Sequence, residues 1–131
     1  MKKFVIPALM ATMLSNLAWA DWVRVGENNR LIAYADTGIR RSGDSATYWV
    51  LFDYKTVQES ARSGKRYLSE KTQREIDCQS ESDRALFFTW HAEHMGNGTV
   101  VYTGNQPTNW EPTSSPASLG NSFWKFVCGK K

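Results

Sequence analysis

The C-terminal stretch 116–128 constrains the fold of this 131-residue chain more than any other segment. Its apolar residues recur at the spacing of one helix face: Leu119, Phe123, Phe126 and Val127. This pattern predicts an amphipathic helix that covers a hydrophobic surface. We expect Ser115 or Ser118 to cap the start of the helix and Gly129 to end it.

The first residues of the chain indicate export. Two lysines precede an apolar run, and the small residues Ala18 and Ala20 stand where signal peptidase reads them. A proline interrupts the run, which falls short of the roughly 20 residues needed to span a bilayer. We therefore predict a secretory signal peptide over 1–20, cleaved after Ala20. The mature domain, 21–131, is expected in the periplasm or outside the cell without a lipid anchor, since no cysteine follows the cleavage point.

The chain contains two cysteines, Cys78 and Cys128. An even count in an exported chain favours a disulfide over free thiols. Metal ligation is the alternative, but it needs a Cys-x-x-Cys pair or histidines at ligand spacing, and neither cysteine has such neighbours. The bridge would tether the helix to a strand and would stabilise the domain by about 4 kcal/mol in the chain-entropy model.

Charge argues against nucleic acid as a partner. The formal net charge is +3, but two of the 16 basic residues, Lys2 and Lys3, belong to the leader, which leaves 14 basic against 13 acidic residues. Proteins that bind nucleic acid usually carry a clear basic excess on one face. We expect no nucleic-acid partner.

Alternating apolar residues predict about seven short antiparallel strands. They cover residues 22–25, 31–35, 39–41, 47–54, 68–78, 84–94 and 99–103. The segment 47–54 is apolar on both faces, as is typical of a central strand, and we interpret 55–64 as a polar loop. Strands followed by one helix make an α+β domain.

Two predicted strands carry specific expectations about their faces. The segment 68–78 should have one buried face, which includes Cys78 and lies under the helix, and one solvated face. In the segment 84–94, one face should hold Leu86, Phe88, Trp90, Ala92 and His94.

The residues that could carry chemistry are few. His91 and His94 have an odd separation, which places them on opposite faces of a strand, so we predict no shared metal site. No nucleophile elbow, phosphate loop or dinucleotide fingerprint occurs, and we expect a protein that is not an enzyme and needs no cofactor. His94 and Met95 are a type of pair that can ligate a haem iron, which leaves a haem site open.

Arg62, Lys65 and Arg66 form the densest basic cluster of the mature chain. They lie in the polar segment between two predicted strands, where loops often carry recognition. The cluster is our candidate binding site for a macromolecule; the alternative is an ordinary solvated loop.

Short motifs along the mature chain follow a recognisable order. They are Trp22, Tyr34-Ala35-Asp36, the run Tyr48 to Tyr54, Ile76-Asp77-Cys78, the Gly96 turn before Val100-Val101, Trp110 with Pro112, Pro116 with Ser118, and Trp124 to Cys128. In this order and spacing they resemble the surface-adhesin protein E family of Gram-negative bacteria. The resemblance implies a small curved antiparallel sheet with a C-terminal helix tethered by the two cysteines.

The same resemblance implies a binding module. The expected partners are a host extracellular matrix protein or a component of the cell envelope, and a homodimer is a further candidate assembly. The alternative is a soluble periplasmic protein that binds a small ligand such as haem.

Overall fold

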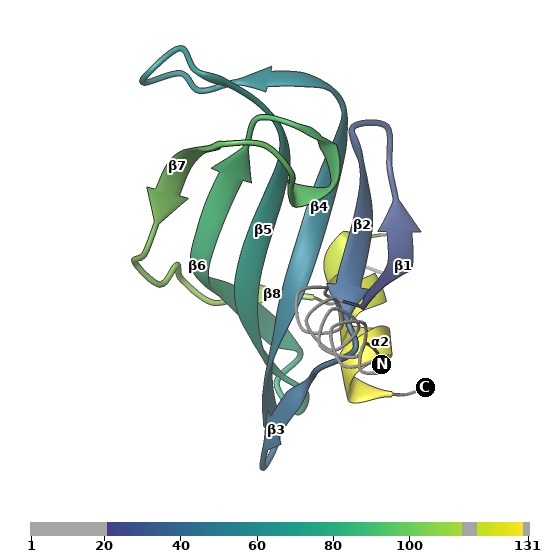
Figure 1. Cartoon of the computed structure of the whole chain (residues 1–131). Coiled ribbons are helices and arrows are strands. Elements are labelled where there is room, and N and C mark those ends of the chain that lie inside the picture. Colours follow the sequence, from purple (N-terminus) through teal and green to yellow (C-terminus); the bar gives the residue numbers. More distant parts are fainter. Residues whose placement is uncertain (1–20, 114–117, 130–131) are drawn as a thin grey trace, which may run out of the picture.

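One antiparallel sheet organises the domain. The computed structural model describes residues 21–113 and 118–129, and within them eight strands pair into a single sheet. The strands are β1 Trp22–Glu27, β2 Leu31–Asp36, β3 Arg40–Ser42, β4 Ser45–Glu59, β5 Arg66–Asp77, β6 Ser82–His91, β7 Val100–Gly104 and β8 Glu111–Pro112. Their main order is β1-β2-β4-β5-β6-β7, with β3 paired to β4 and β8 paired to β6 (Figure 1). The predicted α+β class is confirmed.

Within the described residues, one α-helix packs on a face of this sheet. In Figure 1 the helix α2, Leu119–Cys128, lies behind β1 and β2. The Ser118 side chain caps it by accepting a hydrogen bond from the Asn121 N–H at 3.0 Å, and Gly129 ends it with a φ of 72°. Of the two predicted caps the structure therefore assigns Ser118, while Ser115 lies outside the described residues.

Small residues on the sheet allow the helix to approach closely. Ala33 and Ala35 of β2 are fully buried, and a Cβ added to Gly26 would lie 2.9 Å from the Leu119 Cδ2 atom. The core between helix and sheet consists mainly of aliphatic and aromatic side chains: Leu31, Ala33, Ala35, Ala46, Tyr48, Val50, Tyr54, Ile76, Phe123, Trp124 and Val127. Since β4 contributes buried residues to both faces, including Leu51 on the other side, its predicted central position is confirmed.

A disulfide joins Cys78, just after β5, to Cys128 at the end of α2, with the two Cα atoms 5.7 Å apart. The Trp124 indole N–H also donates a hydrogen bond to the Cys78 carbonyl oxygen at 3.1 Å. The predicted bridge is confirmed. So is the prediction that the helix covers the strand face that carries Cys78, because Ile76 on that face is fully buried.

The predicted loop over 55–64 is wrong in its first half. β4 continues to Glu59, because a register shift between Asp53 and Gln58 lets extra residues bulge out before pairing resumes with Tyr67 and Arg66. The polar composition of 55–59 suits a solvated strand end as well as a loop.

The predicted face of the segment 84–94 is also wrong. Pairing shifts between Gln73 and Arg74, so Leu86 is left in a bulge, and Ala85 joins Phe88 and Trp90 on one face. β6 ends at His91, and Ala92 and His94 lie beyond it, with His94 in a single turn of 3₁₀ helix at 94–96.

The face of β5 predicted to be solvated is half-buried instead. The 94–96 turn covers Ser69 completely, because the Ser69 hydroxyl donates to the Glu93 carbonyl oxygen at 2.5 Å and accepts from the Gly96 N–H at 2.8 Å. The strand β8 has only two residues, so the sequence pattern could not predict it.

The predicted signal peptide lies outside the described residues. Within 21–113 and 118–129, no helix is long and apolar enough to cross a membrane.

Candidate functional site

The helix covers only part of its face of the sheet. Phe52, Glu70, Trp90 and Tyr102 are register partners on β4, β5, β6 and β7, so their side chains share one face. The Phe52 ring contacts Phe123 of α2, with ring centroids 6.1 Å apart. The helix therefore reaches β4, and the rings farther along this row lie beyond it.

A groove of about 380 Å³ lies over these uncovered strands. Phe88, Trp90 and Tyr102 of β6 and β7 form its floor, and residues 60–63 between β4 and β5 also line it. We call this site the aromatic groove. Tyr102 is 43 % exposed.

The rings of the groove continue an ordered aromatic row. Tyr67 stacks flat on Trp90, with centroids 4.2 Å apart and an interplanar angle of 8°, and Trp90 lies 4.9 Å from Tyr102. Phe88 rests over Gly104 of β7, where an added Cβ would come within 2.4 Å of the ring. Only glycine at 104 leaves room for this ring, so the local sequence shapes the floor.

A half-buried carboxylate lies within this aromatic row. Glu70 accepts hydrogen bonds from the Trp90 indole N–H at 3.2 Å and from the Tyr54 hydroxyl at 3.3 Å. Burial raises the pKa of Glu70, while the hydrogen bonds from Trp90 and Tyr54 and the charge of Arg74 act in the opposite direction. Because Glu70 holds the indole nitrogen, it fixes the orientation of Trp90 in the groove.

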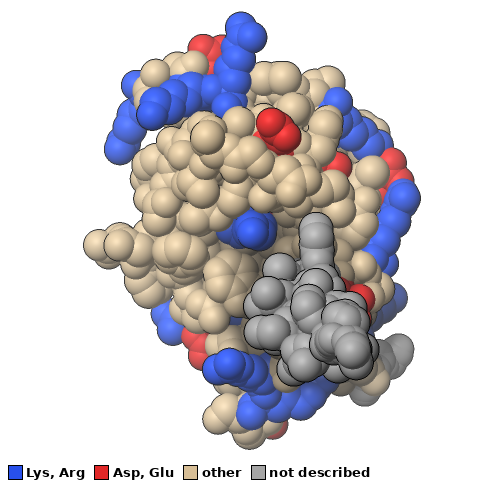
Figure 2. All heavy atoms as spheres, viewed as in Figure 1, with Lys and Arg blue, Asp and Glu red and all other residues tan. Residues whose placement is uncertain are grey.

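The hairpin beside the groove carries the predicted basic cluster. Its turn is closed by hydrogen bonds from the Ser60 N–H to the Lys65 carbonyl and from the Gly64 N–H to the Ser60 carbonyl, both 2.9 Å long. Arg62, Lys65 and Arg66 are all exposed, and none of them forms an ion pair with another described residue. Figure 2 shows lysine and arginine side chains gathered on this hairpin at the upper left. Of the three residues, Arg62 lines the groove itself.

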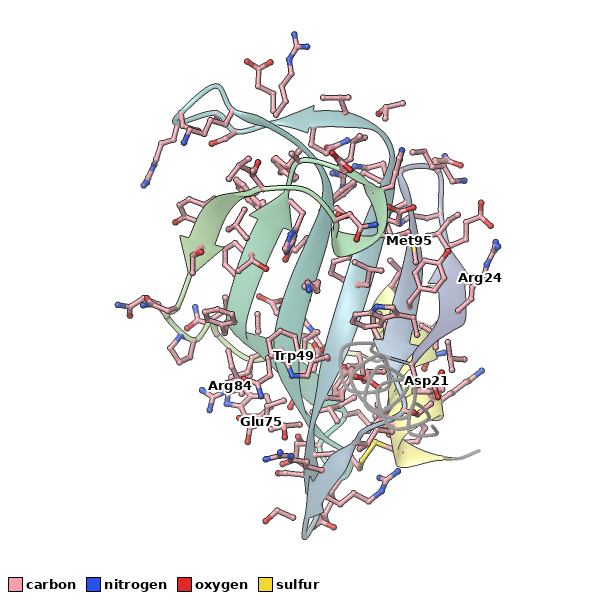
Figure 3. The ribbon with its side chains drawn as sticks, in the orientation of Figure 1. Asp21, Arg24, Trp49, Glu75, Arg84 and Met95 are labelled. Atoms are coloured by element: carbon pink, nitrogen blue, oxygen red, sulfur yellow. A yellow bond between two sulfur atoms is a disulfide. The ribbon has the colours of Figure 1, made fainter. Side chains whose placement is uncertain are left out.

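The predicted haem pair lies elsewhere. His94 and Met95 are on the turn in front of β4 (Figure 3), where the His94 Nδ1 atom lies 3.0 Å from Asp53 Oδ1 and the Met95 N–H donates to the same oxygen at 2.8 Å. Neither residue lines the cavities described here. Among the described residues, no three His, Cys, Asp or Glu side chains are grouped as a metal site.

The sequence predicts the basic cluster but does not reveal the aromatic groove. The alternation in 84–94 places Phe88 and Trp90 on one strand face but does not show whether that face is covered. A helix of 10 residues is about 15 Å long, and strands lie about 4.8 Å apart, so one such helix lying across a sheet covers about three strands. This comparison of helix length with sheet width is the feature of the sequence that indicates an uncovered aromatic face.

Comparisons with known proteins agree with this architecture. The family model described as surface-adhesin protein E matches residues 22–129. A search of curated proteins found no match.

Solved structures of protein E from Haemophilus influenzae have a similar fold. One is 12 % identical, with a TM-score of 0.63 over 82 % of this chain and 83 % of that chain. A second crystal form is also 12 % identical, with a TM-score of 0.65 over 82 % of this chain and 86 % of that chain. A structure from a non-typeable strain is 13 % identical, with a TM-score of 0.62 over 82 % and 74 % of the two chains. At this identity the similarity shows the fold alone.

Proposed function

The chain belongs to the surface-adhesin protein E family, and from this membership we propose that it is a non-enzymatic, exported binding module for macromolecules. The proposed partner is a host matrix protein or a cell-envelope component. In this proposal an acidic segment of the partner docks in the aromatic groove beneath the basic hairpin.

The observation that carries this proposal is the position of unpaired cations beside uncovered rings. Arg62 reaches the groove, and Lys65 and Arg66 follow it on the same hairpin. Tyrosine, tryptophan and arginine are the residues most enriched at the energetic centres of protein interfaces. A partner segment with carboxylates next to apolar side chains would match both the charges and the floor of the groove.

The remaining features of the chain fit a binding role. The Glu70 carboxylate within the aromatic row is engaged by Trp90 and Tyr54, so it acts as a support for the rings. The predicted leader would carry the domain out of the cytoplasm, to the compartment in which such partners occur.

The haem alternative is not favoured, because His94 is held by Asp53 and lies away from the groove and its rings.

A charge-reversal variant provides the test. Lys65→Glu combined with Arg66→Glu should weaken binding to immobilised laminin and vitronectin about tenfold, since each exposed ion pair contributes up to about 1 kcal/mol. Wild-type binding should also fall as salt shortens the screening length below about 8 Å. The measurement is surface binding across a salt series.

The chain offers a matched control on the opposite end of the sheet. Arg40 and Arg41 are exposed on β3, far from the hairpin in Figure 1. Reversing both charges gives the same change in net charge and should leave binding nearly unchanged. Equal loss in the two double variants, or binding that does not depend on salt, contradicts the proposal.

A further inference from the structure

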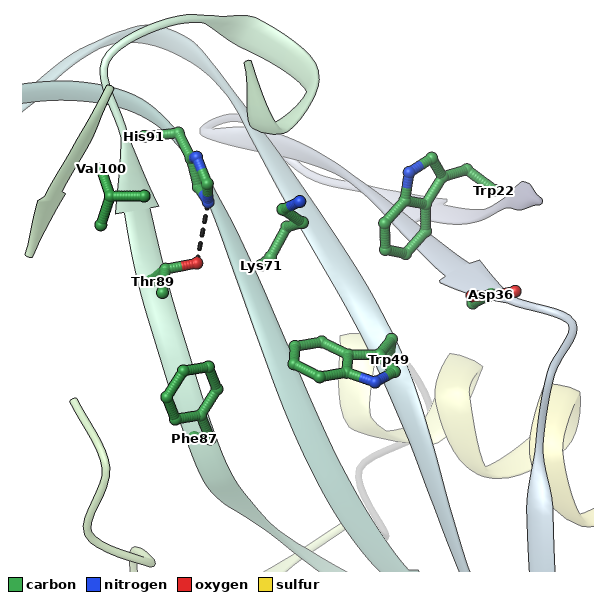
Figure 4. Close-up of a pocket in the computed structure, with 8 residues that line it drawn as sticks. All are labelled: Trp22, Asp36, Trp49, Lys71, Phe87, Thr89, His91 and Val100. Atoms are coloured by element: carbon green, nitrogen blue, oxygen red, sulfur yellow. Dashed lines mark hydrogen bonds between the residues drawn. The ribbon is translucent and has the colours of Figure 1, made fainter. Parts of the chain in front are cut away.

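A second cavity lies on the other face of the sheet, the face turned away from α2. Its volume is about 450 Å³, within the range of small-molecule sites. Alternate residues from six strands line it: Trp22, Asp36, Trp49, Lys71, Phe87, Thr89, His91 and Val100 (Figure 4). We call it the Lys71 cavity.

The walls of the Lys71 cavity are aromatic. Trp49 and Phe87 meet edge to face, with ring centroids 6.1 Å apart and an interplanar angle of 82°. Trp22 lies across the cavity from Phe87 in Figure 4, and Val100 contributes an aliphatic side chain that is 52 % exposed. A flat apolar group could lie among these side chains and remove their surface from water.

Lys71 is held in the middle of the cavity. It lies between Leu51 and Thr89, its register partners on β4 and β6. The 94–96 turn packs on its aliphatic stem, because a Cβ added to Gly96 would lie 3.2 Å from both Lys71 Cδ and Cε. Figure 4 shows the amine end of this stem projecting into the space toward Trp22. The ammonium group is therefore positioned before any ligand arrives.

No carboxylate of the described residues forms an ion pair with Lys71. The acidic residues on this face have other partners. Asp36 accepts from the Gly38 N–H at 3.1 Å, Asp53 is engaged by the 94–96 turn, and Glu75 pairs with Arg84 at 2.9 Å, as Figure 3 also shows. A cation placed among apolar walls without its own counter-ion favours an anionic ligand.

His91 adds no competing charge to the cavity at neutral pH. Burial lowers its pKa below the usual 6.5, and the positive charge of Lys71 lowers it further. The His91 Nε2 atom and the Thr89 hydroxyl share a hydrogen bond of 2.8 Å, which forms a polar side wall. Lys71 is thus the cation of the cavity that an anion would meet, while Asp36, the carboxylate that also lines the cavity, accepts a hydrogen bond from the Gly38 N–H.

We propose that the Lys71 cavity binds a small aromatic carboxylate, with its ring against Trp49 and Phe87 and its carboxylate on the Lys71 ammonium. Carboxylate is the group of choice because a single lysine supplies one compact positive charge. This site goes beyond the proposed docking of a macromolecule and lies on the opposite face of the sheet. Either proposal can fail without the other.

Two isosteric probes test the charge requirement. The exported protein is titrated with 1-naphthoate and, separately, with the neutral 1-naphthamide, and the indole N–H signals of Trp22, Trp49 and Trp90 are followed by NMR. We expect shifts at Trp22 and Trp49 and none at Trp90. The acid should bind at least about tenfold more tightly than the amide, as for a hydrogen bond to a charged group.

A matched pair of variants assigns this preference to Lys71. Lys71→Met keeps the length of the side chain and should abolish the preference for the acid, while retained amide binding shows that the cavity is intact. Lys65→Met removes a hairpin cation on the other site and should change nothing. The proposal is overturned if wild type binds both probes equally, if Lys71→Met keeps the preference, if Trp90 shifts in place of Trp22 and Trp49, or if inorganic phosphate at the same concentration displaces naphthoate.

Discussion

Glu70 lies beneath the aromatic groove. Burial favours its protonated form, whereas its hydrogen bonds favour the ionised form. Its two partners, Tyr54 and Trp90, are themselves part of the aromatic row. Loss of these hydrogen bonds would free the Trp90 ring. The residue therefore links the shape of the groove to the stability of the fold.

This arrangement predicts a pH dependence with a definite sign. Burial raises the pKa of Glu70 above 4.5, so the folded protein holds this proton more tightly than the unfolded chain. The stability that the group contributes is present below pH 4.5 and is lost as pH rises through the raised pKa. Glu70→Gln removes the titration while its amide oxygen can still accept a hydrogen bond.

Urea denaturation of wild type and Glu70→Gln at two pH values measures the effect. The free energy of unfolding of the variant, relative to wild type, should be larger at pH 7 than at pH 4.5. Glu59→Gln, an exposed residue at the end of β4, controls for the general loss of a negative charge. The explanation is wrong if the relative stability of Glu70→Gln is the same at both pH values.

At the scale of single residues, the sequence predicts those properties that depend on neighbours along the chain. Arg62, Lys65 and Arg66 are close in sequence, so their clustering and exposure could be predicted. The alternation in 68–78 puts Lys71 on the strand face predicted to be solvated, but it does not predict that no carboxylate of the described residues pairs with Lys71. That property depends on where Asp36, Asp53 and Glu75 find other partners in the folded protein.

At the scale of elements, the tether between α2 and β5 decides which part of the sheet is covered. The Cys78–Cys128 bridge closes a loop between residues 50 apart in the chain, and the Trp124 indole reinforces the same junction. The helix is short, and isolated helices of this length are marginal in water. Its stability therefore rests on packing and on the bridge.

Cys128→Ser should lower the free energy of unfolding by about 2 to 4 kcal/mol, because the unfolded chain regains the entropy of an open loop. Chemical denaturation of the oxidised protein measures this loss. The double variant Cys78→Ser with Cys128→Ser should match the single one, since either change removes the whole bridge. An unchanged denaturation midpoint in both would contradict the assignment.

Elements with regular spacing were predictable, and irregular pairing was not. The alternation in 47–54 and the helical spacing in 119–127 come from the chain itself. The bulges near Asp53 and at Leu86 arise from pairing with a neighbouring strand, so they shift side chains between faces without a local signal. These bulges explain the errors in the 55–64 loop and in the face of β6.

At the scale of the whole molecule, the short helix α2 covers only part of the wide sheet that the described residues form. The aromatic groove lies on the helix face beyond β4, and the Lys71 cavity lies on the reverse face. The sequence predicts a helix on a sheet, and the family resemblance agrees. The strand order and the Cys78–Cys128 bridge together decide which strands stay uncovered. Both depend on contacts between distant parts of the chain, so local sequence patterns do not predict them.

The central claim is that the aromatic groove is the docking surface for a macromolecular partner. Hydroxyl-radical footprinting reads the solvent exposure of single side chains and can compare free and bound protein directly. Tyr102 in the groove is 43 % exposed. Trp110 is 42 % exposed, and its ring packs against Arg84, which pairs with Glu75 on the reverse face of the sheet. The two rings therefore begin with equal exposure on different faces. In complex with laminin or vitronectin, oxidation of Tyr102 should fall severalfold while oxidation of Trp110 stays constant; protection of Trp110 with Tyr102 unchanged would contradict the account.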